Sequence, residues 1–513
     1  MNYTPEVNPE ANPHANPLYT TPIKFGSLEI RPLDLLEHVL ATGATGSGKT
    51  RSFVLPLVEQ LLLRFGKDPA QKAGMILLDA KGDMAELAGE CIRRSGRSED
   101  LYILGEGGNC WFSLFEQFDG DPTSVANFLF ETLEDRSGGG GGSNDSFWEE
   151  NARRLLRAAV TCAKAEFGIE LGGLQGIADG VNLVMKSRVK GDDDDDEPAE
   201  DWATKKAKEI EAIATEGFLA GRISLHESNE LAGYLKNDVV DGNSRTWLTI
   251  ANMARNYIAQ FSQPALQELF REGEGRRRLV PEDVIDDGLL LIVSLSPVIF
   301  GEAATPFRIA LKKAFCERIL QRNHLVIREG GQQREINQIR PIFYVMDEFH
   351  TTLSAHGRSS DAYFLDRARE FRCGCILATQ GISAISSVVE QRGMRNHLLN
   401  NCRTKFFFAN DCPETLEYFE YIGGMEDKRV SSVHFKRVAT PPRFRLPNHT
   451  FAPPPKSVVV SHSLDNRKQA RFSGAGLGAL PNGTALVVMK GRKLERFTLD
   501  PQNYSGGKRE EQP

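Results

Sequence analysis

The chain has 513 residues, of which 40% are hydrophobic and 26% are charged, and its formal net charge at pH 7 is −7. These values are ordinary for a folded globular protein and argue against a disordered chain. The acidic balance argues against a small DNA-binding module of the repressor type, because such modules are usually basic overall. A chain of this length accommodates about two to four domains.

The cysteines and the apolar runs indicate the compartment. The eight cysteines are scattered, with no C-x-x-C pair and no Cys/His cluster at zinc spacing, which favours reduced thiols in a cytosolic core. No signal peptide is visible, and no run approaches the roughly 18 apolar residues of a membrane span. The sequence therefore predicts a cytoplasmic protein with no integral membrane segment.

The N-terminal residues 1–24 are polar and contain Asn-Pro pairs at even spacing, beginning at Asn8, Asn12 and Asn16. Polar chain ends punctuated by proline are commonly disordered. We predict a disordered tail over 1–24, with an arm that docks on a neighbouring subunit as the alternative. A short C-terminal tail is predicted over 506–513.

From residue 37 onwards, short apolar runs alternate with segments of helical periodicity. Most runs are continuously apolar, as in strands that are buried on both faces of a largely parallel sheet. Together with the intervening helical segments, they predict an α/β fold. The predicted strands are His38–Thr42, Met75–Leu78, Leu101–Leu104, Leu289–Leu295, Ile342–Met346, Cys375–Ala378, Thr404–Ala409 and Ala485–Met489.

The region 145–270 departs from this rhythm, because its apolar residues recur at helical spacing. It follows the consecutive glycines Gly138–Gly142, which are typical of a flexible linker. We predict an all-α domain over 145–270, inserted into an α/β domain formed by 25–137 and 271–505. The predicted helices are Phe147–Glu166, Trp202–Thr215 and Ser244–Leu269, the last interrupted at Pro264.

The segment Lys428–Arg471 is basic, with ten Lys or Arg residues and one acid, Asp465. Phenylalanines and prolines are interspersed among its charges. A basic, loop-rich segment with interleaved aromatic residues is typical of a groove for nucleic acid. Contact with a neighbouring subunit, or a solvated surface that neutralises acidic neighbours, are the alternatives.

Residues 43–50 match the pattern G-x-x-x-x-G-K-[ST], which is typical of a P-loop between a buried strand and a helix. The glycines allow successive backbone N–H groups to point at phosphate oxygens, and the helix start adds its positive dipole end. Lys49 is predicted to reach the β- and γ-phosphates of ATP, and the Thr50 hydroxyl to bind Mg²⁺. The predicted phosphate-binding residues are Gly43, Ala44, Thr45, Gly46, Ser47, Gly48, Lys49 and Thr50.

The predicted strand Ile342–Met346 ends in two acids, Asp347 and Glu348. Carboxylates at the end of an apolar strand are costly unless they meet a cation or water. In a P-loop ATPase, the first acid holds Mg²⁺ through water and the second polarises the attacking water. We predict these roles for Asp347 and Glu348.

Another predicted strand is followed by Gln380, and a glutamine at this place can sense the γ-phosphate or orient the attacking water. A polar strand cap is the alternative. Arg369 lies in an arginine-rich segment before the same strand. It is either an arginine finger that completes the ATP site of a neighbouring subunit or part of a surface helix with internal ion pairs. Arg403 is the second candidate for the finger.

These residues, in this order, resemble the type IV secretion coupling ATPases, the TraD/TraG group within the FtsK–HerA superfamily. The resemblance covers residues 25 to 504 approximately. The motifs that carry it are the P-loop, Asp79-Ala-Lys81-Gly82-Asp83, the helix start Asp145–Ala152, Asp347-Glu348-Phe349, and the pair Arg369 and Gln380.

The resemblance implies a RecA-like core with an inserted all-α domain, ATP and Mg²⁺ as cofactors, and a homo-oligomeric ring, expected to be a hexamer. It implies that Lys49, Thr50, Asp347, Glu348 and Gln380 form the ATP site. It also implies that the arginine which the family carries before its glutamine-bearing strand is Arg369 here.

The chain departs from the family pattern at several places. Most members begin with transmembrane helices, and none is visible in this sequence. The family's Asp-Pro-Lys-Gly segment has an alanine at position 80. The acidic run Asp192–Glu197 and the segment Glu329–Arg334 look like insertions. We therefore expect a cytoplasmic coupling-type ATPase without the transmembrane anchor, and the resemblance implies peripheral attachment to the inner membrane as the alternative.

The expected function is an ATP-driven motor of conjugative or type IV secretion type, stimulated by DNA, which recruits and pumps single- or double-stranded DNA or nucleoprotein. One alternative is a HerA-like translocase in DNA processing or defence. The other is an ATP-gated receptor that binds relaxase or secretion-channel proteins and never translocates DNA.

Overall fold

The computed structural model describes most of the chain, and the structural statements below concern that part. The described residues are 14, 16–25, 28–66, 72–80, 82, 84–113, 115, 118, 120–134, 145–171, 173–186, 199–240, 244–259, 264–270, 272–322, 326–329, 332–335, 340–355, 360–438, 444–446, 449–451, 456–471, 474–489 and 495–499. The predicted glycine linker Gly138–Gly142, the acidic run Asp192–Glu197 and the predicted tail 506–513 lie outside it.

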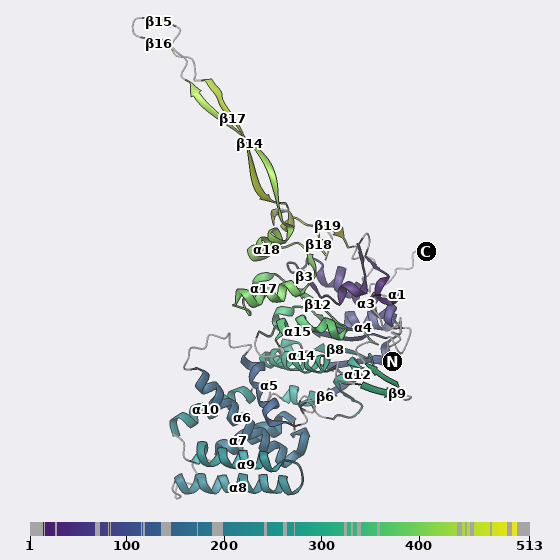
Figure 1. Ribbon diagram of the computed structural model, residues 1–513, viewed down its shortest axis with the longest axis vertical. Helices are drawn as coiled ribbons and strands as arrows, with labels where there is room; N and C mark the ends of the chain where they lie inside the picture. The colour runs from purple at the N-terminus through teal and green to yellow at the C-terminus, as the bar shows by residue number, and fades with distance from the viewer. Residues whose placement is uncertain are drawn as a thin grey trace, which may run out of the picture.

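A nine-stranded sheet forms the centre of the molecule (Figure 1). Its order is β19-β18-β13-β3-β12-β11-β4-β8-β5; the strands from β13 to β5 are parallel, and β18 and β19 are antiparallel to their neighbours. Every predicted strand is present, with ends shifted by at most two residues, so the predicted α/β fold is confirmed. The strands are β3 (Val39–Thr42), β4 (Gly74–Asp79), β5 (Leu101–Gly105), β8 (Leu290–Ser294), β11 (Ile342–Met346), β12 (Cys373–Thr379), β13 (Thr404–Phe407), β18 (Thr484–Val488) and β19 (Glu495–Thr498).

Helices cover both faces of this sheet, because most of its strands are apolar on both sides. In β3, Val39 and Ala41 belong to one hydrophobic core and Leu40 to the other, as the two-residue period of a strand requires. The first core is closed by α3 (Leu55–Phe65) and α4 (Met84–Arg94), and the second by α14 (Ala304–Leu320), α15 (Asp361–Ala368) and α17 (Arg392–Asn401).

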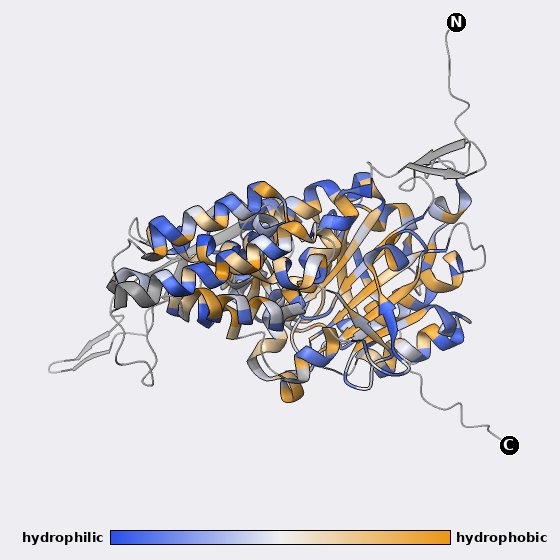
Figure 2. Cartoon of the chain, turned by 90° about the horizontal axis from the view of Figure 1, so that it is seen from below, coloured by the Kyte–Doolittle hydropathy of each residue, from blue (hydrophilic) through white to orange (hydrophobic). Residues whose placement is uncertain are grey.

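A second group of helices lies beside the sheet, in the region predicted to be all-α. The described regular structure between β6 (Cys110–Phe112) and β7 (Arg277–Leu279) is helical. Figure 2 shows apolar strands enclosed among helices that alternate between polar and apolar residues. The longer helices are α5 (Pro122–Glu134), α6 (Asp145–Phe167), α7 (Gly173–Lys186), α8 (Ala199–Leu219), α9 (Leu225–Tyr234) and α10 (Ser244–Ala259).

The predicted interruption at Pro264 is a helix boundary. Helix α10 ends at Ala259, and Pro264 begins the short helix α11 (Pro264–Gln267), a position where the missing N–H of proline costs nothing. None of the described helices is both long enough and apolar enough to cross a membrane.

The predicted disordered tail over 1–24 extends too far along the chain. Residues 17–20 form helix α1 (Pro17–Thr20), and Ile23 begins β1 (Ile23–Phe25). The side chain of Tyr19 is 2% exposed, and its ring lies edge-on to Phe65 with 5.2 Å between centroids. This buried aromatic contact anchors the segment on the sheet domain. The predicted tail residues 1–13 lie outside the described part.

The basic segment Lys428–Arg471, predicted to be rich in loops, is instead dominated by two long strands. β14 (Met425–Val438) pairs antiparallel with β17 (Lys456–Ala470), with a register shift between His434 and Phe435. Figure 1 shows this ribbon extending away from the body of the molecule beside α18 (Pro413–Gly423). Each strand of the ribbon pairs with one neighbour in the described part of the chain, so the alternate backbone groups on its outer edge point away from that partner. The side chains of residues 428–469 lie outside the described part.

Candidate functional site

The predicted site residues gather at one edge of the sheet. β3 leads into the P-loop, β12 ends directly before Gln380, and β11 ends directly before Asp347. These strands are parallel neighbours in the order β3-β12-β11. Their carboxyl ends therefore lie side by side, which is where open α/β sheets place their ligands.

The P-loop adopts the backbone that its glycines allow. Gly46 and Gly48 have φ angles of +80° and +99°, in a region that residues with a side chain rarely enter. A Cβ atom at Gly43 would lie 2.6 Å from Cβ of Phe408 and 2.6 Å from Oγ of Ser47. Glycine is thus required at Gly43 by lack of space and at Gly48 by the backbone angle.

Lys49 lies inside the curl of this loop. Its side chain is buried, and its Nζ donates hydrogen bonds to the carbonyls of Gly43 at 2.6 Å and Ala44 at 3.2 Å. Thr45 and Gly46 are exposed at the tip. The cation is therefore enclosed by the same backbone whose N–H groups form the predicted phosphate cradle.

Thr50 and Asp347 are brought together across the sheet edge. The Thr50 hydroxyl donates to Oδ2 of Asp347 at 3.2 Å, although the two residues are 297 positions apart. Asp347 is 5% exposed, and its N–H donates to the carbonyl of Leu78 at the end of β4. A hydroxyl and a carboxylate are hard oxygen ligands of the kind that Mg²⁺ prefers, so this pair fits the predicted metal position.

Glu348 is buried beside Asp347 in a strained conformation. Its φ angle is +51°, and a non-glycine residue in this region costs about 1–3 kcal/mol, as is common at functional sites. Two hydrogen bonds from Thr351, one from its N–H at 2.8 Å and one from its hydroxyl at 2.9 Å, hold the Glu348 carbonyl. Oε2 of Glu348 lies 3.6 Å from Nδ1 of His350. The turn therefore fixes where the carboxylate is presented.

Gln380 lies at the end of β12, between the P-loop strand and the strand that leads to Asp347. Its side chain is exposed, and its carbonyl accepts a hydrogen bond of 2.7 Å from Nδ2 of Asn410. The backbone of Gln380 is thus held in place, and its side-chain amide faces solvent. This arrangement leaves the amide accessible to a bound nucleotide.

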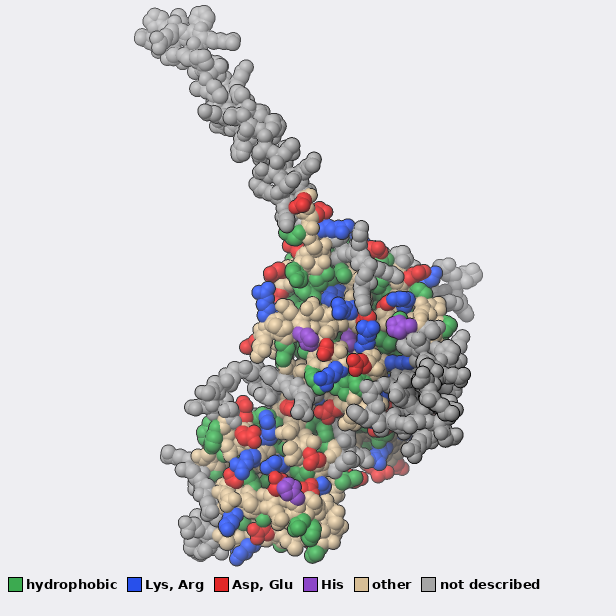
Figure 3. All heavy atoms as spheres, viewed as in Figure 1, with side chains coloured by type: hydrophobic (Ala, Val, Ile, Leu, Met, Phe, Trp, Pro, Cys, Tyr) green, Lys and Arg blue, Asp and Glu red, His purple; other side chains and the backbone are tan. Residues whose placement is uncertain are grey.

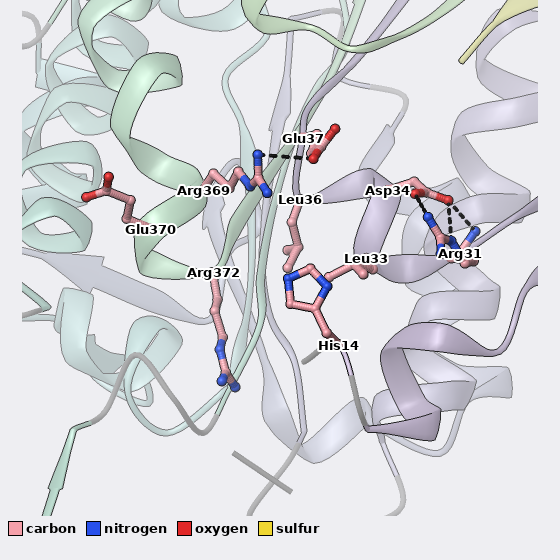
Figure 4. Close-up of a pocket in the computed structure, with 9 residues that line it drawn as sticks. All are labelled: His14, Arg31, Leu33, Asp34, Leu36, Glu37, Arg369, Glu370 and Arg372. Carbon is pink, nitrogen blue, oxygen red and sulfur yellow. Dashed lines mark hydrogen bonds and ion pairs between the residues drawn. The ribbon is translucent and has the colours of Figure 1, made fainter. Parts of the chain in front are cut away.

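Arg369 lies at the opposite edge of the sheet from the P-loop of its own chain. It precedes β12, a strand of seven residues, which spans about 20 Å at 3.3 Å per residue. It lines a cleft of about 500 Å³ and pairs with Oε1 of Glu37 at 3.0 Å (Figure 4). Arg403 is exposed at the same edge, where its N–H donates to the carbonyl of Glu37. Neither arginine reaches the ATP-site residues of its own chain.

The Asp79–Asp83 motif is only partly described, because Lys81 and Asp83 lie outside the described residues. Oδ1 of Asp79 accepts a hydrogen bond of 2.9 Å from the N–H of Gly82. Arg308 of α14 is buried and donates to the carbonyls of Ala80 and Leu295, each at 3.1 Å. Burial lowers the pKa of Arg308 to about 10. The motif therefore caps β4 next to the site.

Several site residues were missed in the sequence. The N–H of Gly483 donates to the carbonyl of Ser47 at 3.0 Å, and its nitrogen would lie 2.9 Å from a Cβ at Gly48. The Asn-Gly pair at 482–483 is a turn signal that predicts a loop there, but nothing local predicts its contact with the P-loop. His350 and Thr379 were also missed; they flank the predicted residues Glu348 and Gln380 in sequence.

Charged side chains of both signs are interspersed over the face that Figure 3 shows, on the sheet domain and on the helical domain alike. No extended field of one sign dominates that face among the coloured residues. The sequence concentrates positive charge in Lys428–Arg471 instead.

No protein-family model and no curated protein matches the sequence. Among solved structures, the unbound bacterial conjugative coupling protein TrwB is similar over 96% of this chain and 91% of that chain, with a TM-score of 0.59 and 15% identity. TrwB with the ATP analogue ADPNP is similar over 96% and 91%, with a TM-score of 0.57 and 16% identity. TrwB with ADP and Mg²⁺ is similar over 95% and 91%, with a TM-score of 0.58 and 15% identity. The shared fold extends over nearly the whole chain.

Proposed function

We propose that this chain is a Mg²⁺-dependent ATP hydrolase that works as a DNA-moving motor of the conjugative coupling type, in a homo-oligomeric ring expected to be a hexamer. The observation that carries the hydrolase is the contact between Thr50 and Asp347, which joins the P-loop to the acidic strand end. TrwB, crystallised with ADPNP and with ADP and Mg²⁺, has the same fold. That likeness supports both the nucleotide and the coupling role.

Each residue has a distinct task in this proposal. The N–H groups of the P-loop and the Lys49 ammonium hold the phosphates of ATP. Thr50, and Asp347 through water, would hold Mg²⁺, which would supply positive charge beside the phosphates. The Glu348 carboxylate accepts a proton from the attacking water, and Gln380 orients that water.

ATP hydrolysis by variants tests the site. Lys49→Ala should abolish hydrolysis, because no other described lysine lies within the loop. Glu348→Gln should still bind ATP and hydrolyse it poorly, since the amide keeps the shape and lacks the base. Lys24→Ala, which removes a lysine that is 73% exposed in its side chain, is the control and should hydrolyse ATP normally. Near-normal turnover by Lys49→Ala or Glu348→Gln would overturn the assignment.

DNA stimulation separates a motor from an ATP-gated receptor that binds relaxase or secretion-channel proteins. If the ribbon β14–β17 grips DNA, neutralising its basic residues should weaken DNA binding and flatten its salt dependence. Affinity measured at several salt concentrations tests this. If the salt dependence of DNA affinity is unchanged in these variants, the ribbon is a solvated surface and does not bind DNA. If the ATPase rate is the same with and without DNA, the ATP-gated receptor is favoured.

A further inference from the structure

Thr379 connects three parts of the candidate site. Its carbonyl accepts a hydrogen bond of 3.3 Å from the N–H of Gly43, the first glycine of the P-loop. Its hydroxyl lies 3.2 Å from Nδ1 of His350 and 3.5 Å from the carbonyl of Gly381. Thr379 is completely buried, so these contacts are not shared with bulk water.

The His350 imidazole lies between the Thr379 hydroxyl and the carboxylate of Glu348. Its Nδ1 faces both the Thr379 hydroxyl, at 3.2 Å, and Oε2 of Glu348, at 3.6 Å. If Nδ1 carries the proton, it donates toward these two oxygens, and the Thr379 hydroxyl remains able to donate to the carbonyl of Gly381. With this tautomer, the oxygens of Glu348 and Gly381 act as acceptors, and the Thr379 hydroxyl accepts from Nδ1 and donates to Gly381.

The strain at Glu348 explains why such a contact is needed. A glutamate with φ of +51° is held in a backbone well that favours glycine, and the hydrogen bonds from Thr351 fix only its carbonyl. Nδ1 of His350, at 3.6 Å from Oε2 of Glu348, is beyond ordinary hydrogen-bond distance and within reach of a small shift of the carboxylate. Distances of this kind often shorten when substrate binds.

We propose that His350 is a positioning residue, which holds the Glu348 carboxylate in place and links it through Thr379 to the P-loop and to the strand end that carries Gln380. The inference rests on the proposed function, in which Glu348 is the base. It assigns the link between the base and the P-loop to the His350 imidazole and to Thr379, whose hydroxyl meets the imidazole and whose carbonyl meets the N–H of Gly43.

The test compares His350→Ala, His350→Asn and His350→Gln by kcat and by affinity for a fluorescent ATP analogue. The alanine variant should lose roughly tenfold or more in kcat, within the ~10²–10⁴-fold contribution of a general base, and should bind the analogue normally. Asparagine should recover much of the loss and glutamine little, because the amide nitrogen of asparagine stands as far from Cβ as Nδ1 does. Unchanged kcat in His350→Ala, or equal rates in the asparagine and glutamine variants, would overturn the proposal.

The link is also tested from its other end. Thr379→Val removes the hydroxyl at nearly constant shape and should lower kcat, whereas Thr379→Ser should keep most of it. This pair remains informative if His350→Ala fails to fold. Equal rates in Thr379→Val and Thr379→Ser would contradict the link.

A double variant separates this inference from the assignment of the base. His350→Ala should add no further loss in a Glu348→Gln background, because side chains that act as a unit are not additive. A further loss would show that His350 acts apart from Glu348 and would overturn the inference alone. Normal hydrolysis by Glu348→Gln itself would instead overturn the proposed role of Glu348.

Discussion

At the scale of single residues, two glycines of this chain, Gly43 and Gly89, make opposite contributions. Gly43 has no room for a side chain, since a Cβ would approach both Phe408 and Ser47 to 2.6 Å. Gly89, in helix α4, has nothing within 4 Å of a Cβ position. The first glycine is needed for the shape of the P-loop, and the second only adds conformational entropy to the unfolded chain.

Alanine substitutions should therefore act in opposite directions. Gly43→Ala should displace Phe408 or the P-loop and lower ATP affinity and stability together. Gly89→Ala should stabilise the protein by about 0.5–1 kcal/mol and leave ATP binding unchanged. Thermal unfolding and titration with an ATP analogue measure both effects. A fully active, equally stable Gly43→Ala protein would contradict the packing around the P-loop.

At the scale of elements, α14 is a helix buried on nearly all sides that nevertheless carries charged residues. Nζ of Lys312 donates to Oδ2 of Asp361 at 2.6 Å, and the two side chains are 0% and 3% exposed. Lys312 also donates to the carbonyl of Thr352, and Asp361 accepts the N–H of Ser354 at 2.6 Å. The ion pair thus ties α14 to the turn that follows Glu348.

Breaking this pair on one side should be costly. Lys312→Met should destabilise the protein by about 3–5 kcal/mol, because it leaves the Asp361 carboxylate buried without its cation. Adding Asp361→Asn should restore part of that loss, since the uncompensated charge is removed. Chemical denaturation of the single and double variants measures the difference. If the double variant is less stable than Lys312→Met, the buried charge is not the cause.

Another residue of α14 makes stability depend on pH. Burial and the neighbouring Glu131 carboxylate, outweighing Lys313, raise the pKa of Glu317 from 4.5 to about 7. The folded state thus holds a proton on Glu317 that the unfolded state has released, so the contribution of Glu317 to stability falls as pH rises from about 4.5 to 7. A shift of this size corresponds to about 3 kcal/mol.

Glu317→Gln should therefore be more stable than the parent protein at pH 8 and similar to it near pH 4.5. Unfolding free energies at the two pH values measure the difference, and Glu86→Gln, at an exposed position of α4, is the control. A gain in Glu317→Gln that is the same at both pH values would contradict the raised pKa.

At the scale of the whole molecule, the residues proposed for catalysis lie at two opposite edges of the sheet. The P-loop, Asp347 and Glu348 lie at the carboxyl edge, and Arg369 lies at the amino edge in an ion pair with Glu37. A P-loop ATPase also needs positive charge at the transition state, which an arginine commonly supplies in trans. We therefore propose that Arg369 serves the ATP site of the next subunit in the ring.

Mixing experiments test this shared site. Arg369→Ala should bind ATP normally and lose most of its turnover, and mixing it with Lys49→Ala subunits should restore part of the activity at interfaces that pair an intact P-loop with an intact arginine. Arg31→Ala, which removes another arginine of the same cleft, ion-paired with Asp34, should retain turnover. Full activity of Arg369→Ala, or a concentration-independent rate in a chain that stays monomeric, would contradict the shared site, with Arg403 as the next candidate.

Two segments show where local pattern misled the prediction. The tail over 1–24 has few apolar residues, yet Tyr19 and Ile23 are buried in a core of the sheet domain, where the ring of Tyr19 contacts Phe65. The ribbon β14–β17 was predicted as loops because charges and prolines interrupt its apolar pattern. In the described part of the chain its strands pair with each other, and a strand outside the main sheet need not carry the continuous apolar run from which the strands of that sheet were predicted.

The sequence by itself determined eight of the nine strands of the sheet, all but β19, together with the P-loop and the two acids at the end of β11, because each is a contiguous pattern whose signal is local. Only the tertiary structure decided that β12 lies between β3 and β11, which places Thr379 against both Gly43 and His350 and leaves Arg369 at the far edge. Strand order depends on how helices pack between distant strands, and no short-range periodicity encodes it. The contact of Gly483 with Ser47 has the same origin, since it joins segments separated by most of the chain.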